Sequence, residues 1–321
     1  MESSGGTNAE TGDGRTGPTE PTNAEPGSEA DPGLASRLRY LVTLSRPRFW
    51  FYLAGPVVVG VAFAAESVPE LFGPVGLALF AYFLLPANVL LYGVNDVYDA
   101  EIDAENPKKE AGGREARFSG ERWVVAVVVA SGLVGLGTFA LVPVGAWPWL
   151  GAFFVLAVEY SAPPLRFKTT PLLDSVSNGL YILPGVVAYV AVAGRQPPAA
   201  AVVGGWLWAM GMHTFSAIPD IEPDREAGIR TTATVLGEER TYAYCGAAWL
   251  SAAVAWAFVD NRIALLMLAY PVVVFAIYWS NVDVDEAYWW YPAINTVVGM
   301  LLTMGALTRI VPPASLLEAL R

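Results

Sequence analysis

The sequence predicts an all-α membrane protein, a bundle of about nine transmembrane helices with loops that cap its cytoplasmic end. Three observations predict this class: 54% of the 321 residues are hydrophobic, the mean hydropathy is +0.43, and only 15% of the residues are charged. Ordinary soluble domains carry about 25% charged residues. In a bilayer, a chain of this length forms one bundle of about eight to ten spans of roughly 20 residues each.

The first part of the chain differs from the rest. Residues 1–36 carry seven acidic side chains against Arg15 alone, and they are rich in Gly, Pro, Ser and Thr. A segment with so few large apolar residues cannot bury enough surface to offset the entropy lost on ordering. We therefore expect residues 1–36 to form a disordered acidic tail and residues 37–321 to form the transmembrane domain. The tail also lacks the apolar stretch of a secretory signal peptide.

The charged residues are typical of proteins from extreme halophiles. The formal net charge is −11, and 16 arginines stand against 3 lysines. Surface carboxylates remain hydrated in strong brine, although a GC-rich genome would also favour Arg over Lys. Cys245 is the only cysteine, which excludes an intrachain disulfide and a cysteine-based metal site.

Nine apolar stretches follow the tail. Most of them reach the roughly 17–25 residues that a helix needs to cross a bilayer. The fourth stretch is short, so a bundle of eight helices is the alternative. The stretches cover about 49–66, 73–97, 122–142, 145–160, 173–193, 199–218, 241–259, 262–280 and 291–311.

The basic residues predict the orientation of these spans. If the N-terminus is cytoplasmic, the cytoplasmic segments 37–48, 98–122, 161–172 and 219–240 contain 14 of the 19 Lys and Arg residues. Positive charges close to span ends are enriched on the cytoplasmic side. The loop at 281–290 is cytoplasmic by the same count, but it has no basic residue. We expect a multi-pass protein of the cell membrane with a cytoplasmic N-terminus.

An acidic motif follows the second span. Asn95, Asp96, Asp99 and Asp103 come directly after the apolar stretch, and their spacing places the three carboxylates on one face of a helix. Crowded carboxylates repel one another unless a cation lies among them, and Mg²⁺ typically joins a few carboxylates to substrate phosphates. A solvated helix end would explain one aspartate but not the series, so the motif predicts a magnesium site.

A second acidic motif ends the sixth span. Asp220 and Asp224 are four residues apart and share a helix face. The predicted topology places them on the same side of the membrane as the first motif, so the two motifs could face each other across one cavity. Together they could hold on the order of two or three Mg²⁺ ions on a diphosphate, neutralising the leaving group as a carbon–oxygen bond breaks.

Basic side chains on the same side are candidates for contact with a diphosphate. Arg166 and Lys168 follow the turn at Pro163-Pro164, and Arg46 and Arg48 stand at the entrance of the first span. Each of them could instead be an ordinary topology anchor.

Other polar residues within or near the spans have less definite roles. Glu159, Asp174 and Asn178 lie near cytoplasmic span ends, where an ionisable group is either functional or simply solvated. His213 is the only histidine. It either lines a cavity or packs in the core.

The chain resembles the UbiA superfamily of intramembrane prenyltransferases over about residues 37–311. The two acidic motifs carry the resemblance, with Arg225 and Gly228 after the second motif and the segment 160–168. It implies a nine-helix bundle whose acidic motifs lie near a cytoplasmic cap, over a cavity open to lipid. It also implies that the catalytic and Mg²⁺-binding residues are Asp96, Asp99, Asp103, Asp220 and Asp224. The residues that it implies for binding the prenyl diphosphate are Asn95, Arg46, Arg166, Lys168 and Arg225.

The second motif departs from the family pattern. Many members have an Asn-Asp pair four residues before its aspartate, whereas Ser216-Ala217 stands there in this chain. The second site is therefore expected to hold metal with fewer carboxylates.

Segments 45–56 and 95–110 resemble the lycopene elongase branch of the superfamily. These enzymes of haloarchaea and some actinobacteria add a five-carbon unit to each end of lycopene in carotenoid biosynthesis. The resemblance implies transfer of a dimethylallyl group to lycopene, after which the new cation loses a proton or captures water. A polyene needs an apolar, aromatic slot, and the chain has 11 Trp, 14 Tyr and 14 Phe. Aromatic faces stabilise cations, although many of these rings are expected in interface belts.

Other functions remain open on the sequence alone. The acceptor could be geranylgeranylglyceryl phosphate, a menaquinone precursor or haem. A transporter without catalysis would more often place its carboxylates at mid-membrane in broken helices, whereas here they follow helix ends. The chain has no glycine-rich phosphate-binding loop and no basic face for nucleic acid, so no nucleic-acid partner is expected.

Overall fold

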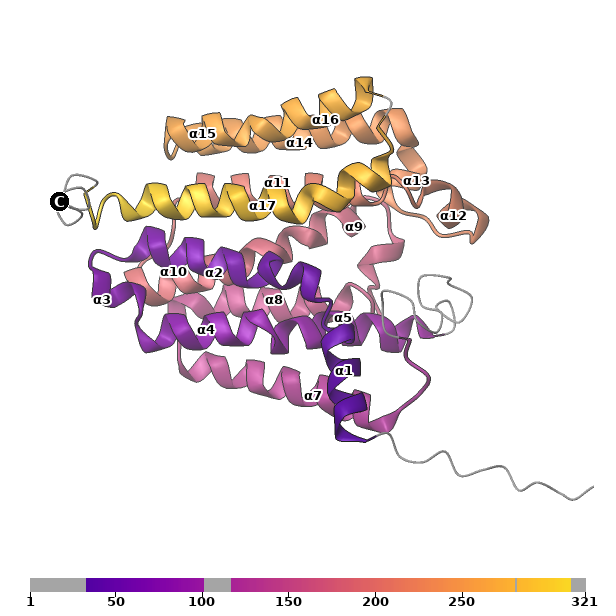
Figure 1. Cartoon of the computed structure of the whole chain (residues 1–321), viewed down its shortest axis with the longest axis horizontal. Coiled ribbons are helices and arrows are strands. Elements are labelled where there is room, and N and C mark those ends of the chain that lie inside the picture. Colours follow the sequence, from indigo (N-terminus) through magenta and orange to yellow (C-terminus); the bar gives the residue numbers. More distant parts are fainter. Residues whose placement is uncertain (1–32, 101–116, 281, 313–321) are drawn as a thin grey trace, which may run out of the picture.

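The structure is a computed structural model, and it describes residues 33–100, 117–280 and 282–312. In these ranges the secondary structure is helical, without a strand. The long helices lie side by side and run nearly parallel, while α1 runs crosswise to them (Figure 1). This arrangement confirms the predicted all-α membrane bundle.

The helices follow the order of the predicted spans. Six segments are long and apolar enough to cross a membrane: Pro47–Ala64, Val68–Tyr98, Arg122–Ala140, Leu173–Ala193, Asn261–Trp279 and Val284–Leu307. The shorter apolar segment Val144–Glu159 and the helices α11 (Ala199–Ser216) and α14 (Glu238–Ala257) match the three remaining stretches.

Several spans are divided into shorter helices. The remaining α-helices are α1 (Leu34–Leu44), α2 (Trp50–Ala64), α3 (Val68–Leu71), α4 (Pro74–Leu84), α5 (Pro86–Tyr98), α7 (Arg122–Gly137), α8 (Trp147–Glu159), α9 (Leu173–Val176), α10 (Leu183–Ala193), α12 (Ile221–Glu226), α13 (Thr232–Leu236), α15 (Asn261–Met267), α16 (Ala269–Trp279) and α17 (Val284–Leu307). Short 3₁₀ turns join them at η1 (Pro47–Phe49), η3 (Thr138–Ala140), η4 (Val144–Ala146), η5 (Phe167–Thr169) and η6 (Ser177–Ile182).

The break in the second span has a clear cause. Pro86 has no backbone N–H, so α4 ends at Leu84 and α5 begins at Pro86. The carbonyl groups of Phe83 and Leu84 each accept a hydrogen bond of 3.0 Å from the side-chain amide of Asn88. Asn88 is fully buried, and this contact satisfies backbone groups that lipid could not hydrogen-bond. The break therefore leaves α5 as a separate helix that ends at the first acidic motif.

Two helices begin earlier than the sequence suggests. Helix α1 starts at Leu34, three residues before the expected domain boundary at 37, and residues 1–32 lie outside the described ranges. Helix α17 starts at Val284 rather than near 291. The side chain of Asp283 caps it by accepting from the N–H groups of Asp285 and Glu286. Acidic residues stabilise a helix N-terminus, so the acidic loop that we expected at 281–290 is mostly the first turns of α17.

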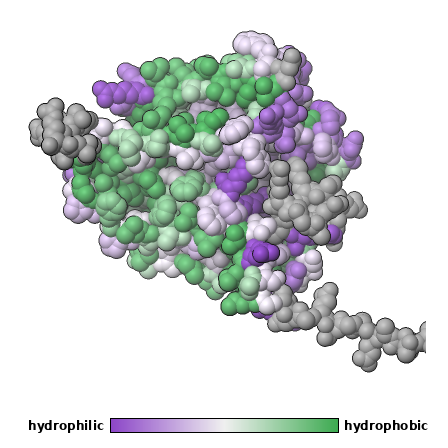
Figure 2. Space-filling view, in the orientation of Figure 1, coloured by the Kyte–Doolittle hydropathy of each residue, from purple (hydrophilic) through white to green (hydrophobic). Residues whose placement is uncertain are grey.

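Apolar side chains both fill the bundle and cover its outside. One buried cluster lies among α2, α4, α5, α8 and α10, and a second lies among α11, α14, α15, α16 and α17. Hydrophobic residues cover much of the face in Figure 2, and hydrophilic residues gather mainly beside α12 and α13. An outer surface of this kind suits lipid as the solvent.

Glycine allows a close helix crossing. Helices α2 and α10 pack against each other, and a Cβ atom on Gly60 would lie 2.2 Å from the carbonyl oxygen of Gly185. A Cβ atom on Gly185 would lie 2.6 Å from the carbonyl oxygen of Pro56. Small residues at such crossings let membrane helices gain close van der Waals contact.

We expect the Gly60→Ala variant to be less stable than the wild type by about 1–3 kcal/mol, because the new methyl group would force α2 and α10 apart. Thermal unfolding in detergent should show a lower midpoint. Gly151→Ala is the matched control, since a Cβ atom there would meet nothing within 4 Å. An equal effect of the two substitutions would contradict the close approach.

Candidate active site

The first acidic motif lies at the end of α5. Asn95 and Asp96 are in the last turn of this helix, and Asp99 is its C-terminal cap residue. Asp96 is buried, with 1% of its surface exposed, and Asp99 is partly buried. Asp103 lies outside the described residues. A carboxylate removed from water needs a cation or hydrogen-bond donors nearby.

Arg46 contacts the buried carboxylate of Asp96. Its Nη2 atom lies 3.4 Å from Oδ1 of Asp96, and its guanidinium carbon lies 4.6 Å from the ring centroid of Tyr92. Tyr92 precedes Asp96 by four residues and therefore shares its face of α5. The arginine that opens the first span is thus directed at the acidic end of the second.

Two basic side chains form ion pairs with Asp99. Arg166 Nη2 lies 3.0 Å from Oδ1 of Asp99, and Lys168 Nζ forms an ion pair with Oδ2. The side-chain amide of Asn95 donates to the same Oδ2 at 3.1 Å and to Ser161 Oγ at 3.0 Å. The segment 160–168 and the end of α5 therefore form one charged cluster, and the contact of Arg166 and Lys168 with a diphosphate stays a prediction.

Arg46 and Arg166 share an unusual backbone conformation. Their φ angles are 50° and 43°, in the left-handed region, and each residue directly precedes a 3₁₀ turn. This region costs a residue other than glycine on the order of 1–3 kcal/mol, and such residues cluster at functional sites. The conformation directs both guanidinium groups toward the carboxylates of α5.

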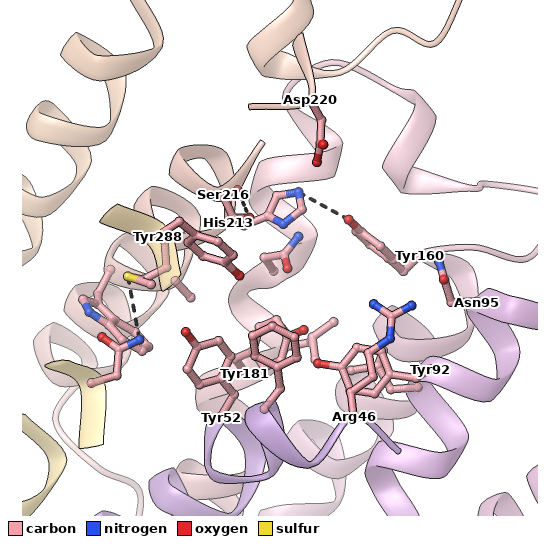
Figure 3. A pocket seen from close by; sticks show the side chains of 18 residues that line it. Arg46, Tyr52, Tyr92, Asn95, Tyr160, Tyr181, His213, Ser216, Asp220 and Tyr288 are labelled. Atoms are coloured by element: carbon pink, nitrogen blue, oxygen red, sulfur yellow. Dashed lines mark hydrogen bonds between the residues drawn. The ribbon is translucent and has the colours of Figure 1, made fainter. Parts of the chain in front are cut away.

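A polar cavity of about 320 Å³ opens beside this cluster. Asp220 lies at one side of it in Figure 3, with Arg46 and Tyr92 on the other. We call it the polar cavity, and its wall consists of Arg46, Phe49, Tyr52, Leu91, Tyr92, Asn95, Tyr160, Asn178, Leu180, Tyr181, Trp208, Ala209, Met212, His213, Ser216, Asp220, Tyr288 and Asn295. Asn95 of the first motif and Asp220 of the second thus line one space, whereas Asp96 and Asp99 are not among its lining residues.

Sequence reasoning did not single out four of the five tyrosines of this wall. Tyr52, Tyr92, Tyr181 and Tyr288 come from four separate parts of the chain. Only Tyr92 gave a usable signal, its position one helical turn before Asp96. The other three are brought together by packing between distant helices, which spacing along the chain does not reveal.

The second acidic motif belongs to a short cap. Asp220 precedes α12 and lines the polar cavity, whereas Asp224 lies within α12 and is not among the lining residues. Arg225 donates to the carbonyl oxygen of Thr234 at 3.0 Å and forms an ion pair with Glu222 at 2.7 Å. In this structure Arg225 therefore joins α12 to α13, and its contact with a diphosphate stays a prediction.

Asp174 ties this cap to the bundle. It has 1% of its surface exposed, accepts from the backbone N–H of Thr232 at 2.8 Å, and also contacts the Thr232 hydroxyl. The Thr232 hydroxyl accepts from the N–H of Leu172 at 2.7 Å. Asp174 is therefore not simply solvated, because its carboxylate holds α13 against α9.

A larger apolar cavity of about 680 Å³ adjoins the polar cavity. Tyr52, Trp208 and Asn295 line both. The apolar cavity lies between α2, α10, α11, α15 and α17, and its wall includes Val59, Phe63, Val186, Val202, Ile263, Met267, Val298 and Leu302. The polar cavity and the apolar cavity thus share part of their walls.

Comparison with known proteins identifies the family. The model of the UbiA prenyltransferase family matches residues 53–304. The lycopene elongase/hydratase of Haloferax volcanii is 70% identical over 88% of this chain and 93% of its own length. The lycopene elongase/hydratase of Halobacterium salinarum is 62% identical over 85% of this chain and 98% of its own length. A UbiA homologue from Archaeoglobus fulgidus, solved with DMAPP and Mg²⁺, has a TM-score of 0.64 at 22% identity and covers 83% of this chain and 99% of its own.

We expect the Asp174→Ala variant to loosen the cap, because the N–H of Thr232 loses its acceptor at a cost of about 1–3 kcal/mol. Hydrogen exchange should accelerate about tenfold or more in residues 228–236. Glu222→Ala is the control, since its ion pair with Arg225 is exposed and such pairs contribute little. Unchanged exchange in Asp174→Ala would show that the carboxylate does not hold the cap.

Proposed function

The chain belongs to the UbiA prenyltransferase family, and on that basis we propose that it transfers the dimethylallyl group of dimethylallyl diphosphate (DMAPP) to lycopene held in the membrane. The observation that carries this proposal is the pair of adjoining cavities, one charged and one apolar, that share Tyr52, Trp208 and Asn295. The identity of 62–70% to haloarchaeal lycopene elongase/hydratases supports the choice of acceptor.

The prenyl diphosphate would bind at the charged end of the polar cavity. Beside this end, Arg46 contacts Asp96, and Arg166 and Lys168 contact Asp99. Diphosphate oxygens would share these cations with the carboxylates, and each charged hydrogen bond contributes about 1.5–3 kcal/mol. Asn95 and Arg225 complete the set of diphosphate contacts that we propose.

The oxygen donors of the two motifs fit Mg²⁺. No three His, Cys, Asp or Glu side chains within residues 33–100, 117–280 and 282–312 form a ready-made metal site. Mg²⁺ is commonly held by one or two carboxylates together with substrate phosphates, so the donors present suit an ion that arrives with a diphosphate. When bound, Mg²⁺ neutralises charge on the diphosphate leaving group. We propose as its ligands Asp96, Asp99, Asp103, Asp220 and Asp224.

The departure at Ser216-Ala217 is consistent with fewer carboxylates at the second motif. Ser216 lines the polar cavity, and its hydroxyl donates to the carbonyl oxygen of His213 at 2.7 Å. It offers a hydroxyl where many members of the family have the asparagine of the pair, and Ala217 stands where they have the aspartate.

Aromatic rings would protect the allylic cation. Tyr52, Tyr92, Tyr181 and Tyr288 line the polar cavity between its charged end and the apolar cavity. Their faces stabilise positive charge through the ring quadrupole, by about 2 kcal/mol or more where water is excluded. The same rings keep bulk water from a cation that it would otherwise capture.

The acceptor would lie in the apolar cavity. A polyene has no polar group to orient, so it needs length and an apolar wall more than hydrogen bonds. The cavity supplies such a wall between α2, α10, α11, α15 and α17, and it places one end of the polyene at Tyr52 and Trp208, beside the prenyl donor.

We also propose the orientation of the protein. Multi-pass insertion follows from the apolar helices and the family. The excess of basic residues near the acidic motifs supports a cytoplasmic position for this end of the bundle, where soluble DMAPP would be available. Residues 1–36 would then form a cytoplasmic tail.

We expect Asp96→Asn and Asp99→Asn to reduce turnover to less than about a tenth of wild type, because each removes a charge from the proposed Mg²⁺–diphosphate site. Release of diphosphate from DMAPP by purified protein measures this, and chelation of Mg²⁺ should also abolish turnover. Asp285→Asn, at an exposed site in the first turn of α17, is the matched control. A variant that keeps more than a tenth of the wild-type turnover has lost less than about 1.4 kcal/mol of transition-state stabilisation. That result would show that the substituted aspartate does not belong to the site.

Purified protein supplied with lycopene, DMAPP and Mg²⁺ should yield longer carotenoids by mass analysis. Gly299→Trp should reduce this yield about tenfold or more, because Gly299 lines the apolar cavity with open space at its Cβ position. Gly305→Trp is the matched control, as Gly305 has the same open space on α17 but is not in the cavity wall. If the protein leaves lycopene unchanged and prenylates a quinone precursor or a glyceryl phosphate instead, the proposed acceptor is refuted. The assignment to the family would still stand.

A further inference from the structure

A histidine lines the polar cavity. His213 is the only histidine of the chain, and it lies on α11 in the wall of the polar cavity. It is partly exposed rather than packed into the core. Its neighbours in the wall include Met212, Ala209 and Trp208, and Trp208 also lines the apolar cavity. His213 itself lines the polar cavity and not the apolar cavity.

Tyr160 joins His213 in a hydrogen-bonded pair. The Tyr160 hydroxyl oxygen lies 3.3 Å from Nε2 of His213, and the two rings meet edge-on with centroids 5.9 Å apart. Both side chains are partly exposed and line the same cavity (Figure 3). The backbone of Tyr160 is fixed as well, because its carbonyl oxygen accepts from the N–H of Lys168 at 3.1 Å. Tyr160 thus belongs to the segment that forms the charged cluster, and His213 lies beside it on α11.

The proposed reaction needs a proton acceptor at this place. Breakage of the C–O bond of DMAPP sends its electron pair to diphosphate, and a terminal double bond of lycopene then bonds to the allylic carbon. The new C–C bond leaves a tertiary cation on the acceptor. A water molecule that bonds to this cation must lose one proton to give a stable alcohol. A base therefore has to lie on the acceptor side of the diphosphate.

The other charged groups in or near the wall suit this step less well. Arg46 is a cation that contacts Asp96, and Asp220 belongs to the acidic motif assigned to Mg²⁺. Asp96 and Asp99 contact basic side chains at the end of α5. Asp174 faces Thr232 of the cap. His213 is the nitrogen base of the cavity, and Tyr160 can pass it a proton.

We propose, resting on the function proposed above, that Tyr160 and His213 form a relay that accepts the proton of the water molecule quenching the acceptor cation. The water oxygen bonds to the tertiary carbon and gives one proton to the Tyr160 oxygen, while the Tyr160 proton moves to Nε2 of His213. The products are the alcohol, diphosphate and a protonated His213, which later returns its proton to solvent. The pair thus decides between a hydroxylated product and an alkene.

The test compares product composition rather than rate alone. Purified wild type, His213→Gln, His213→Asn and Tyr160→Phe are incubated with lycopene, DMAPP, Mg²⁺ and H₂¹⁸O, and the products are separated by mass. Wild type should give an extended carotenoid that contains ¹⁸O. In each variant the ratio of hydroxylated to unhydroxylated product should fall about tenfold or more, since a positioned base contributes on the order of 10²–10⁴-fold.

Tyr244→Phe is the matched control. Its hydroxyl contacts Ser175 Oγ at 2.9 Å and lies outside the wall of the polar cavity, so its product ratio should equal that of wild type. Three variants at two positions keep the test decisive if one of them fails to insert.

The outcomes separate this inference from the proposed function. Wild-type protein that extends no lycopene refutes the proposed function and, with it, the relay. Wild-type protein that extends lycopene without incorporating ¹⁸O, or variants that keep the wild-type ratio, overturn the relay alone. In that case the diphosphate or another group accepts the proton.

Discussion

Buried negative charge at the end of an apolar helix is the constraint on which the rest of the site depends. Asp96 has almost no exposed surface at the end of α5, and a carboxylate in that position is costly without a positive partner. Arg46 from the entrance of α2, and Arg166 and Lys168 from the segment after α8, supply that positive charge at Asp96 and Asp99. The attraction between these basic side chains and the two carboxylates thus brings three distant parts of the chain together. It also gathers the positive charges that a polyanion needs for binding.

Much of the fold and part of the site could be predicted from the sequence. The apolar stretches predicted the spans because length and hydropathy are local properties, and the spacing of Asp96 and Asp99 predicted a shared helix face. The start of α17 was missed because Asp285 and Glu286 look like loop residues, whereas they stabilise a helix N-terminus capped by Asp283. Asp174 and Arg225 showed no local sign of their partners, since Thr232 and Thr234 reach them only through the folded cap.

The tyrosines in the wall of the polar cavity also could not be assigned from the sequence. Tyr52, Tyr181 and Tyr288 meet only because α2, η6 and α17 pack around one space. Their number in the sequence suggested an aromatic slot, but interface belts use the same residue type. Which rings face a cavity is decided by helix packing, including the close crossing of α2 and α10 at Gly60 and Gly185.

The shared wall of the two cavities also bears on processivity. If lycopene is the acceptor and lies in the apolar cavity as proposed, only the end beside Tyr52 and Trp208 would meet a prenyl donor. Its second, equivalent end would point away from the charged cluster, along the apolar cavity. A second extension would then require the polyene to withdraw into lipid, reverse and return. Under that proposal the enzyme would be distributive: it would release a singly extended carotenoid to the membrane before that molecule became a substrate again.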